Sequence, residues 1–405
     1  MRSWRENYTA LLIAETLAIL GFGLSMPVIP LFLEEDIGIR DPVRLKAWVG
    51  LIHFCTGASL AVFAPIWGHL ADIYSRRAML LRAMFGGAIV ISFMALVNSP
   101  WQLLVLKIIQ GCLTGTVAAA TVLTASITPA AQVAFALGLL QTGIAVGNSL
   151  GPLIGGILSD FFGYRFAFFS TGLAMALSGV VVLKWVEDDR RPSKAGKEKN
   201  LSLLPDLKPI AASPLLITLL LATFGVQAAN MVAVPMLPLF LKDLALKMSG
   251  TPMYIGSSTG IVLGVGAASA AIAAVLVGKF SSRTGYWKTL IFCLSAGAIV
   301  SIPQAFVSNM YQLALLRAVS SFFIGGTAPL INAIIAVSSD KENQGTIFGV
   351  NSSVSAVGNA LGPMIGSAAA MLSYRAVFLV AALILGISAL QLIRRRKMSS
   401  GGKGF

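Results

Sequence analysis

The chain has 405 residues, of which 56% are hydrophobic and only 11% charged, and its formal net charge is +14. About a quarter of the residues are charged in ordinary soluble domains, so this composition excludes a fold surrounded mainly by water. The basic residues lie in short segments between apolar runs rather than on one folded face, which argues against nucleic acid as a partner.

Uncharged apolar runs of about 20 residues recur along the chain, and each is long enough to cross a ~30 Å hydrocarbon core as a helix. The first run has no small-residue cleavage site after it, so we interpret it as a retained helix. We predict an all-α polytopic membrane protein with twelve transmembrane helices at 8–33, 48–70, 78–97, 101–124, 134–158, 166–186, 214–241, 256–278, 288–307, 311–335, 345–370 and 374–393.

The segment 187–210 is too polar to bury and is predicted to be a cytoplasmic linker. It divides the chain into a six-helix bundle at 1–186 and a second bundle, with a basic tail, at 211–405. Most Lys and Arg residues of the loops fall on one side of the membrane when the helices alternate, and cytoplasmic segments retain positive charge. We therefore predict a multi-pass protein of the plasma (inner) membrane with both termini in the cytoplasm.

The second half of the chain repeats the first at an offset of about 210 residues. Four signatures recur in the same order: Pro27–Leu33 as Pro235–Leu241, Gly68–Ser75 as Gly278–Gly285, Trp101–Lys107 as Tyr311–Arg317, and Gly147–Pro152 as Gly358–Pro363. Duplicated halves are typical of transporters whose substrate site lies between two pseudo-symmetric bundles near the middle of the membrane.

Three segments resemble the major facilitator superfamily. Gly68–Arg77 is similar to its loop between helices 2 and 3, G-x-L-A-D-R-x-G-R-K, with Ile73 and Ser75 in place of the usual Arg and Gly. Gly147–Gly156 resembles the helix 5 antiporter signature G-x-x-x-G-P-x-x-G-G at every fixed position. Gly21–Pro30 resembles helix 1 of the drug:proton antiporter-1 branch, and the whole chain resembles its MdtG-type multidrug exporters. This resemblance implies the major facilitator fold and an export function.

The first two of these segments contain the candidate gating residues: Asp72, Arg76, Arg77, Gly147, Gly151, Pro152 and Gly155. A carboxylate at a helix end can accept charge-assisted hydrogen bonds and so latch one conformation, whereas the arginines could also serve only to fix the topology. The glycines leave a stripe without side chains for a neighbouring backbone, and the proline adds a bend. Static packing and a hinge or seal between the halves both remain open.

Glu15 and Lys107 are the candidate proton-coupling residues. A carboxyl group about two turns into helix 1 could take up and release a proton as the cavity changes sides, or it could be a snorkelling residue at the helix edge. Lys107 occupies the position where helix 4 of this family usually has Arg, and a lysine can titrate where an arginine stays protonated. Its alternative is a lysine held by carbonyl groups of helix 1, and Arg317, its repeat mate, is expected to be structural.

Polar and aromatic residues facing a predicted substrate cavity could alternatively form hydrogen bonds between helices or pack in the core. They are Gln110, Gln141, Asn148, Phe224, Gln227, Asn230, Phe322, Phe323, Asn332 and Asn351.

We predict a secondary active transporter that exports amphipathic organic molecules in exchange for protons by alternating access. Export of one endogenous metabolite, such as a siderophore or a lipid, is the alternative, and a non-transporting sensor is a distant one. An enzyme is not expected, since the chain has only two histidines and neither a metal-ligand nor a nucleotide-binding motif. No cofactor or metal is expected; the expected partners are a small amphipathic substrate, protons and the lipid bilayer, and the chain is expected to be a monomer.

Overall fold

The structure is a computed structural model that describes residues 3–73, 75–187, 208–211, 213–247, 254–339 and 344–400. Within these ranges every regular element is a helix, and twelve helical segments are long and apolar enough to cross a membrane. The prediction of an all-α polytopic chain with twelve spans is therefore confirmed. Residues 188–207 of the predicted linker lie outside the described residues.

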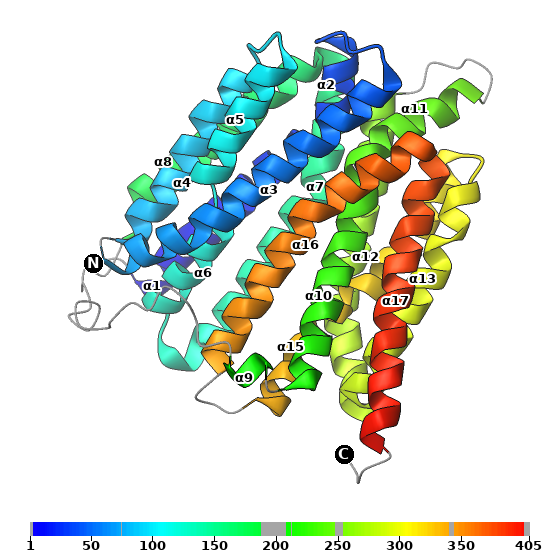
Figure 1. The fold of residues 1–405 in the computed structure, drawn as a ribbon. Coiled ribbons are helices and arrows are strands. Elements are labelled where there is room, and N and C mark those ends of the chain that lie inside the picture. The colour runs from blue at the N-terminus through cyan, green and yellow to red at the C-terminus, as the bar shows by residue number, and fades with distance from the viewer. Residues whose placement is uncertain are drawn as a thin grey trace. The chain divides into compact units, whose positions relative to one another are not determined.

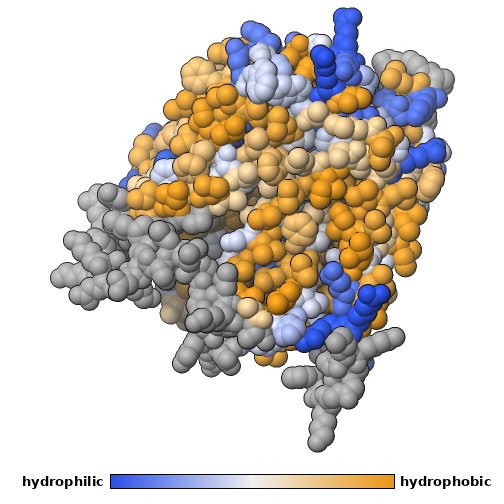
Figure 2. Space-filling model, in the orientation of Figure 1, coloured by the Kyte–Doolittle hydropathy of each residue, from blue (hydrophilic) through white to orange (hydrophobic). Residues whose placement is uncertain are grey.

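Large apolar side chains face outward along the helices. Ile299 of α13 (Tyr286–Ser301), Val275 of α12 (Ile255–Thr284) and Leu383 of α17 (Tyr374–Ser400) are 67%, 72% and 61% exposed. In Figure 2 such side chains cover much of the helix surface, while hydrophilic residues gather towards the helix ends. A water-soluble monomer rarely exposes so much contiguous apolar surface, whereas a bilayer covers it with lipid tails.

The chain divides into two compact units, each built from tightly packed helices (Figure 1). Unit 1 comprises Met1–Leu201 with Thr251–Gly264. In it α1 packs against α7 and α8, α4 against α8, and α3 against α5. Its helices are α1 (Trp4–Leu24), α2 (Ile29–Glu35), α3 (Pro42–Ile73), α4 (Arg76–Met94), α5 (Pro100–Leu113), α6 (Thr116–Ile127), α7 (Val133–Phe162) and α8 (Tyr164–Trp185).

Unit 2 comprises Ser202–Gly250 with Val265–Phe405. In it α10 packs against α16 and α17, and α13 against α17 and α14, which repeats the packing of their counterparts in unit 1. Its helices are α9 (Lys208–Ala211), α10 (Pro214–Ala233), α11 (Leu237–Lys247), α13 (Tyr286–Ser301), α14 (Met310–Gly325), α15 (Thr327–Ser338), α16 (Gln344–Leu372) and α17 (Tyr374–Ser400). Helix α12 (Ile255–Thr284) contributes residues to both units.

Two pairs of predicted spans are interrupted at matching positions of the two halves. The first span breaks between α1 and α2, and its repeat mate breaks at a 3₁₀ turn, Val234–Met236, between α10 and α11. Pro27 and Pro235 occupy these breaks and have no backbone N–H to continue the helix. The fourth span breaks at Gly115, whose φ of 129° favours glycine, and its mate breaks at Gly326. We expected continuous helices here. Discontinuous helices at matching positions of the two halves are typical of the substrate and ion sites of transporters.

Candidate functional site

Glu15 lies in the core of unit 1. Its side chain is 0% exposed, and neither carboxyl oxygen has a hydrogen-bond partner among the described residues. On α1 it is flanked by Leu11, Ala14 and Ala18, which belong to an apolar cluster that also draws residues from α4, α6, α7 and α8. Thr116 of α6 is the polar side chain beside it. Glu15 therefore lies in an apolar interior and not at the helix edge, and its role as the proton carrier stays a prediction.

Lys107 is also buried in unit 1, at 6% exposure on α5. No hydrogen bond or ion pair joins it to Glu15, since both oxygens of that carboxyl group are unpartnered within the described residues. His53 of α3 is the ionisable group near it, and the Nδ1–H of that ring donates to the carbonyl of Val49 at 2.8 Å. Gln110, one turn further along α5, is 0% exposed and also lacks a partner for its amide. The two predicted coupling residues are thus separate buried groups rather than an ion pair.

The glycine stripe of α7 packs against α1. A Cβ atom on Gly147 would lie 2.9 Å from the backbone nitrogen of Leu20, and one on Gly151 would lie 2.6 Å from its carbonyl oxygen. Gly155 meets the backbone of Leu24 in the same way. These three glycines thus perform close packing inside unit 1, which is one of the two roles that the sequence left open.

Unit 2 contains the same stripe on the repeat mate of α7. Gly358, Gly362 and Gly366 of α16 meet the backbone of α10, where a Cβ on Gly358 would lie 2.9 Å from the carbonyl oxygen of Phe224. The packing role of the stripe is therefore common to both halves.

A second face of α7 contacts the first turns of α12, inside unit 1. Gly156 meets the backbone of Gly256, and the carbonyl of Pro152 meets Gly260, so no side chain separates the two helices at these points. Among the predicted gating residues, Pro152 is the one that lies at this contact. Since residues of α12 from Val265 onward belong to unit 2, this helix is the element that the two units share.

Asp160, near the C-terminal end of α7, caps the N-terminus of α12. Its carboxylate accepts the backbone N–H groups of Gly256 at 2.9 Å and Ser257 at 2.6 Å, and the Ser257 hydroxyl at 2.6 Å. Tyr254 directly precedes α12, and its ring stacks on the ring of Phe161 with the two centroids 5.5 Å apart. The first amides of a helix have no partner within it, so a carboxylate from another helix satisfies them. Our sequence reasoning missed Asp160; the signal was that it is the only acid between Asp72 and Glu187.

Arg77 of the loop signature joins α4 to α8 within unit 1. Ser75 caps α4, and Arg77 donates from Nη2 to the carbonyl of Leu183 near the C-terminal end of α8, where a cation is favoured. Arg76 is partly buried at the start of α4. The side chain of Asp72 lies outside the described residues, so its predicted role as a latch stays a prediction.

A polar cavity of about 260 Å³ lies among α10, α15 and α16 of unit 2. The Thr223 hydroxyl donates to Oδ1 of Asn351 at 2.7 Å, and Nδ2 of Asn351 donates to Oδ1 of Asn332 at 3.1 Å. Nε2 of Gln227 donates to the hydroxyl of Ser355 at 2.6 Å. Three of the amides that the sequence singled out thus line one cavity, where Asn351 pairs with Asn332 and Gln227 pairs with Ser355.

The other predicted cavity residues are dispersed. Gln141 and Asn148 are exposed on α7, and Phe224 and Asn230 are half-buried on α10 without lining this polar cavity. Phe322 and Phe323 of α14 line a different, apolar cavity of unit 2.

Comparisons with known proteins agree with this architecture. Residues 11–311 and 298–404 match the Major Facilitator Superfamily. The chain is 35% identical over 377 residues to the multidrug resistance protein MdtG of Proteus mirabilis, covering 93% of this chain and 92% of that protein. It is 33% identical over 383 residues to MdtG of Enterobacter lignolyticus, covering 94% and 90%.

Solved structures share the fold at lower identity. The nucleoside transporter NupG superimposes with a TM-score of 0.77 at 14% identity, covering 96% of this chain and 98% of that one. A bacterial homolog of the human lysosomal transporter Spinster, inward-facing and unoccupied, superimposes with a TM-score of 0.76 at 15% identity, covering 97% of both chains. The chain therefore belongs to the Major Facilitator Superfamily and is a multi-pass membrane transporter rather than an enzyme.

Proposed function

We propose that this transporter exports amphipathic organic molecules across the inner membrane in exchange for protons, by alternating access, with both termini in the cytoplasm. The observation that carries this proposal is the burial of Glu15 at 0% exposure without a hydrogen-bond partner. The name of the MdtG relatives, multidrug resistance protein, supports the substrate class.

The proton site follows from the energetics of a lone acid. A charged carboxylate near the middle of a membrane helix costs roughly 2.5–3.5 kcal/mol on insertion scales, and an unpartnered one in an apolar core has little to offset that cost. Glu15 therefore carries a proton while its surroundings are closed, and it releases the proton when water reaches it. A group that is charged in only one of the two conformations couples the binding of its proton to the equilibrium between them.

The substrate would bind towards the interrupted helices of unit 2. The polar cavity is lined by α10, α15 and α16, and the first two of these adjoin the breaks at Val234–Met236 and Gly326. Its amides and hydroxyls can exchange their mutual hydrogen bonds for bonds to a polar group of the substrate, while Ile331 and Phe348 offer apolar contact. This arrangement separates the proton site in unit 1 from the substrate site in unit 2.

The gate would involve α7 and α12. Asp160 and the glycine contacts hold the first turns of α12 in unit 1. Alternating access requires such contacts to break and re-form in each cycle. The hydrogen bonds of a helix cap, and a backbone contact made at glycines, can break and re-form without any repacking of large side chains.

The test is export from proteoliposomes with an imposed pH difference. The wild type should transport a fluorescent amphipathic dye against its gradient, and Glu15→Gln should reduce this to the level of protein-free liposomes while dye exchange without a pH gradient persists. Glu6→Gln, which neutralises an exposed acid on the same helix, is the matched control and should leave export unchanged. Undiminished pH-driven export by Glu15→Gln would refute the proton site. A growth panel with toxic compounds tests the substrate class, because protection confined to one metabolite would favour a specific exporter.

A further inference from the structure

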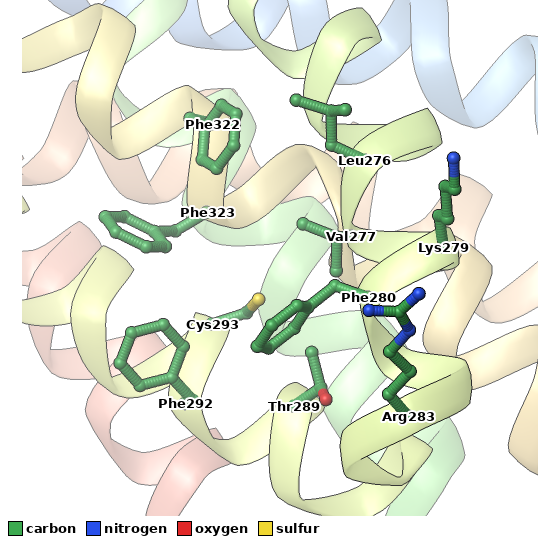
Figure 3. A pocket seen from close by; sticks show the side chains of 10 residues that line it. All are labelled: Leu276, Val277, Lys279, Phe280, Arg283, Thr289, Phe292, Cys293, Phe322 and Phe323. Atoms are coloured by element: carbon green, nitrogen blue, oxygen red, sulfur yellow. The ribbon is translucent and has the colours of Figure 1, made fainter.

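A second cavity of unit 2, of about 560 Å³, lies among α12, α13 and α14 and is not used by the mechanism above (Figure 3). Its walls are largely apolar and include the rings of Phe280, Phe292, Phe322 and Phe323. Two cations, Lys279 and Arg283, line one side of it.

The aromatic walls are held in place by contacts among themselves. The rings of Phe292 and Phe323 meet edge to face at 5.7 Å, and those of Phe322 and Phe323 at 5.8 Å. Phe280 and Phe292 are nevertheless 59% and 61% exposed, so they leave a large apolar area uncovered by protein. Within a membrane span, such an area is in contact with acyl chains or with an apolar ligand.

The two cations lie at the depth of lipid headgroups. Helix α12 has 30 residues and is about 45 Å long, which spans the ~30 Å hydrocarbon core and reaches into the polar layers. Lys279 and Arg283 are in its last turns, four residues apart and so on one helix face. Both are exposed, and neither forms an ion pair with an acid within the described residues. Basic pockets between transmembrane helices on the cytoplasmic side typically bind anionic headgroups, and that is the side predicted for this end of α12.

We propose that this cavity is a binding site for an anionic phospholipid, with Lys279 and Arg283 binding its phosphate and the phenylalanines covering the upper part of one acyl chain. Without the cavity, the two cations could serve only to neutralise the partial negative charge of the carbonyl groups at the C-terminal end of α12, but that role does not require a cavity beside them. The apolar walls alone would accept any acyl chain. The combination selects a lipid with net negative charge over a zwitterionic one of the same chain length.

Leu276 lines the cavity (Figure 3) and is 52% exposed, so a cysteine at this position provides a reporter. The native Cys293 also lines the cavity but is only 2% exposed, which is too buried for a maleimide to reach, and the chain's other two cysteines, Cys55 and Cys112, belong to unit 1. In a Cys55→Ser, Cys112→Ser, Cys293→Ala background, the rate of maleimide labelling of Leu276→Cys therefore reports whether this cavity is occupied.

The experiment measures labelling of the full chain in mixed micelles with phosphatidylglycerol or phosphatidylcholine of identical acyl chains. Phosphatidylglycerol should slow labelling several-fold more than phosphatidylcholine, and Lys279→Gln with Arg283→Gln should abolish the difference. Arg394→Gln with Arg395→Gln removes the same charge from α17 and should preserve it. The exchange Lys279→Arg with Arg283→Lys should also preserve it, which separates charge recognition from misfolding.

Equal protection by the two lipids, or full protection retained by the double glutamine variant, would overturn the proposal. Protection by a transported dye but not by phosphatidylglycerol would overturn it as well, and would assign the cavity to substrate. The proposal does not depend on proton coupling, so loss of coupling in Glu15→Gln leaves this experiment unaffected.

Discussion

The two halves of the transporter have the same arrangement of helices but differ in the polar side chains at two pairs of matched positions. The repeat pairs Glu15 with Thr223 and Leu140 with Asn351. In unit 2 the hydroxyl of Thr223 donates to Asn351 at 2.7 Å, so the polar group has a partner. In unit 1 Glu15 has none, and Leu140 is part of the fully buried apolar cluster around it. The same arrangement of helices thus contains a hydrogen-bonded polar pair in unit 2 and an acid without a hydrogen-bond partner in unit 1.

This difference indicates how the work is divided. A buried polar network with all partners present specifies a fixed geometry, which suits recognition of a substrate. A buried acid without partners is stable only when neutral, which suits exchange of a proton between two states of the protein. A similar asymmetry occurs at the end of α7, where Asp160 caps α12 while its repeat mate in α16 is Met371.

The close glycine packing found in both halves predicts the largest loss of stability. Gly151→Leu and Gly362→Leu each place a side chain against the backbone of the neighbouring helix, which cannot move aside as a flexible side chain could. Each should lower the free energy of unfolding by about 3 kcal/mol or more, at the upper end of overpacking effects. Folded yield and thermal midpoint in detergent measure this. If only one of the pair destabilises the protein, the halves do not share this packing role.

Giving Glu15 the partner that Thr223 has should remove the difference between the halves. Leu140→Asn offers the carboxylate a hydrogen bond worth about 1.5–3 kcal/mol, which favours its charged form by tenfold or more. pH-driven export at neutral pH should fall about tenfold with the protein still folded, and Leu140→Met is the apolar control of similar volume. Export by Leu140→Asn at the wild-type rate would show that the missing partner has no functional weight.

The reverse exchange breaks the network of unit 2. Asn351→Leu leaves the Thr223 hydroxyl and the Asn332 amide without a partner, and should cost about 1–3 kcal/mol of stability. Adding Thr223→Val should recover part of the loss, since it removes one of the orphaned groups. Equilibrium dye binding should weaken, but the number of protons moved per exported dye should stay the same. A changed proton ratio would contradict the separation of the two sites.

The cap on α12 predicts the smallest effect. Asp160→Asn keeps one acceptor oxygen but loses the charge, and should weaken the cap by about 1 kcal/mol, as other helix caps do. Distances between spin labels on α7 and on the first turns of α12 should then show a larger population in which the two helices are apart. Met371→Ala in α16 is the control, because no cap depends on it. An unchanged distance distribution in Asp160→Asn would exclude the cap from gating.

The fold could be predicted from the sequence because apolar runs are local patterns and because the repeat is visible when the two halves of the sequence are compared. The interruptions of four spans were missed, since Pro27, Pro235 and Gly115 interrupt a span without changing its mean hydropathy. The site was predictable only in part. Gln227 and Asn332 line one cavity, but their pairing with Ser355 and Asn351 depends on helix rotation, which hydropathy does not fix.

Asp160 shows a further limit. Its partners are backbone amides nearly a hundred residues away, on α12, and a backbone amide leaves no signature in a sequence. A charged residue at the end of an apolar span can equally well face water, so only the packing of α7 on α12 distinguishes a cap from a surface acid.

Proton release on substrate binding tests the central claim most directly. Purified transporter in weakly buffered detergent solution, with a pH-sensitive dye, should release protons when an amphipathic substrate is added, because opening of the unit 1 core charges Glu15. Glu15→Gln should bind the same substrate and release none. Proton release from Glu15→Gln equal to that of the wild type would contradict the account.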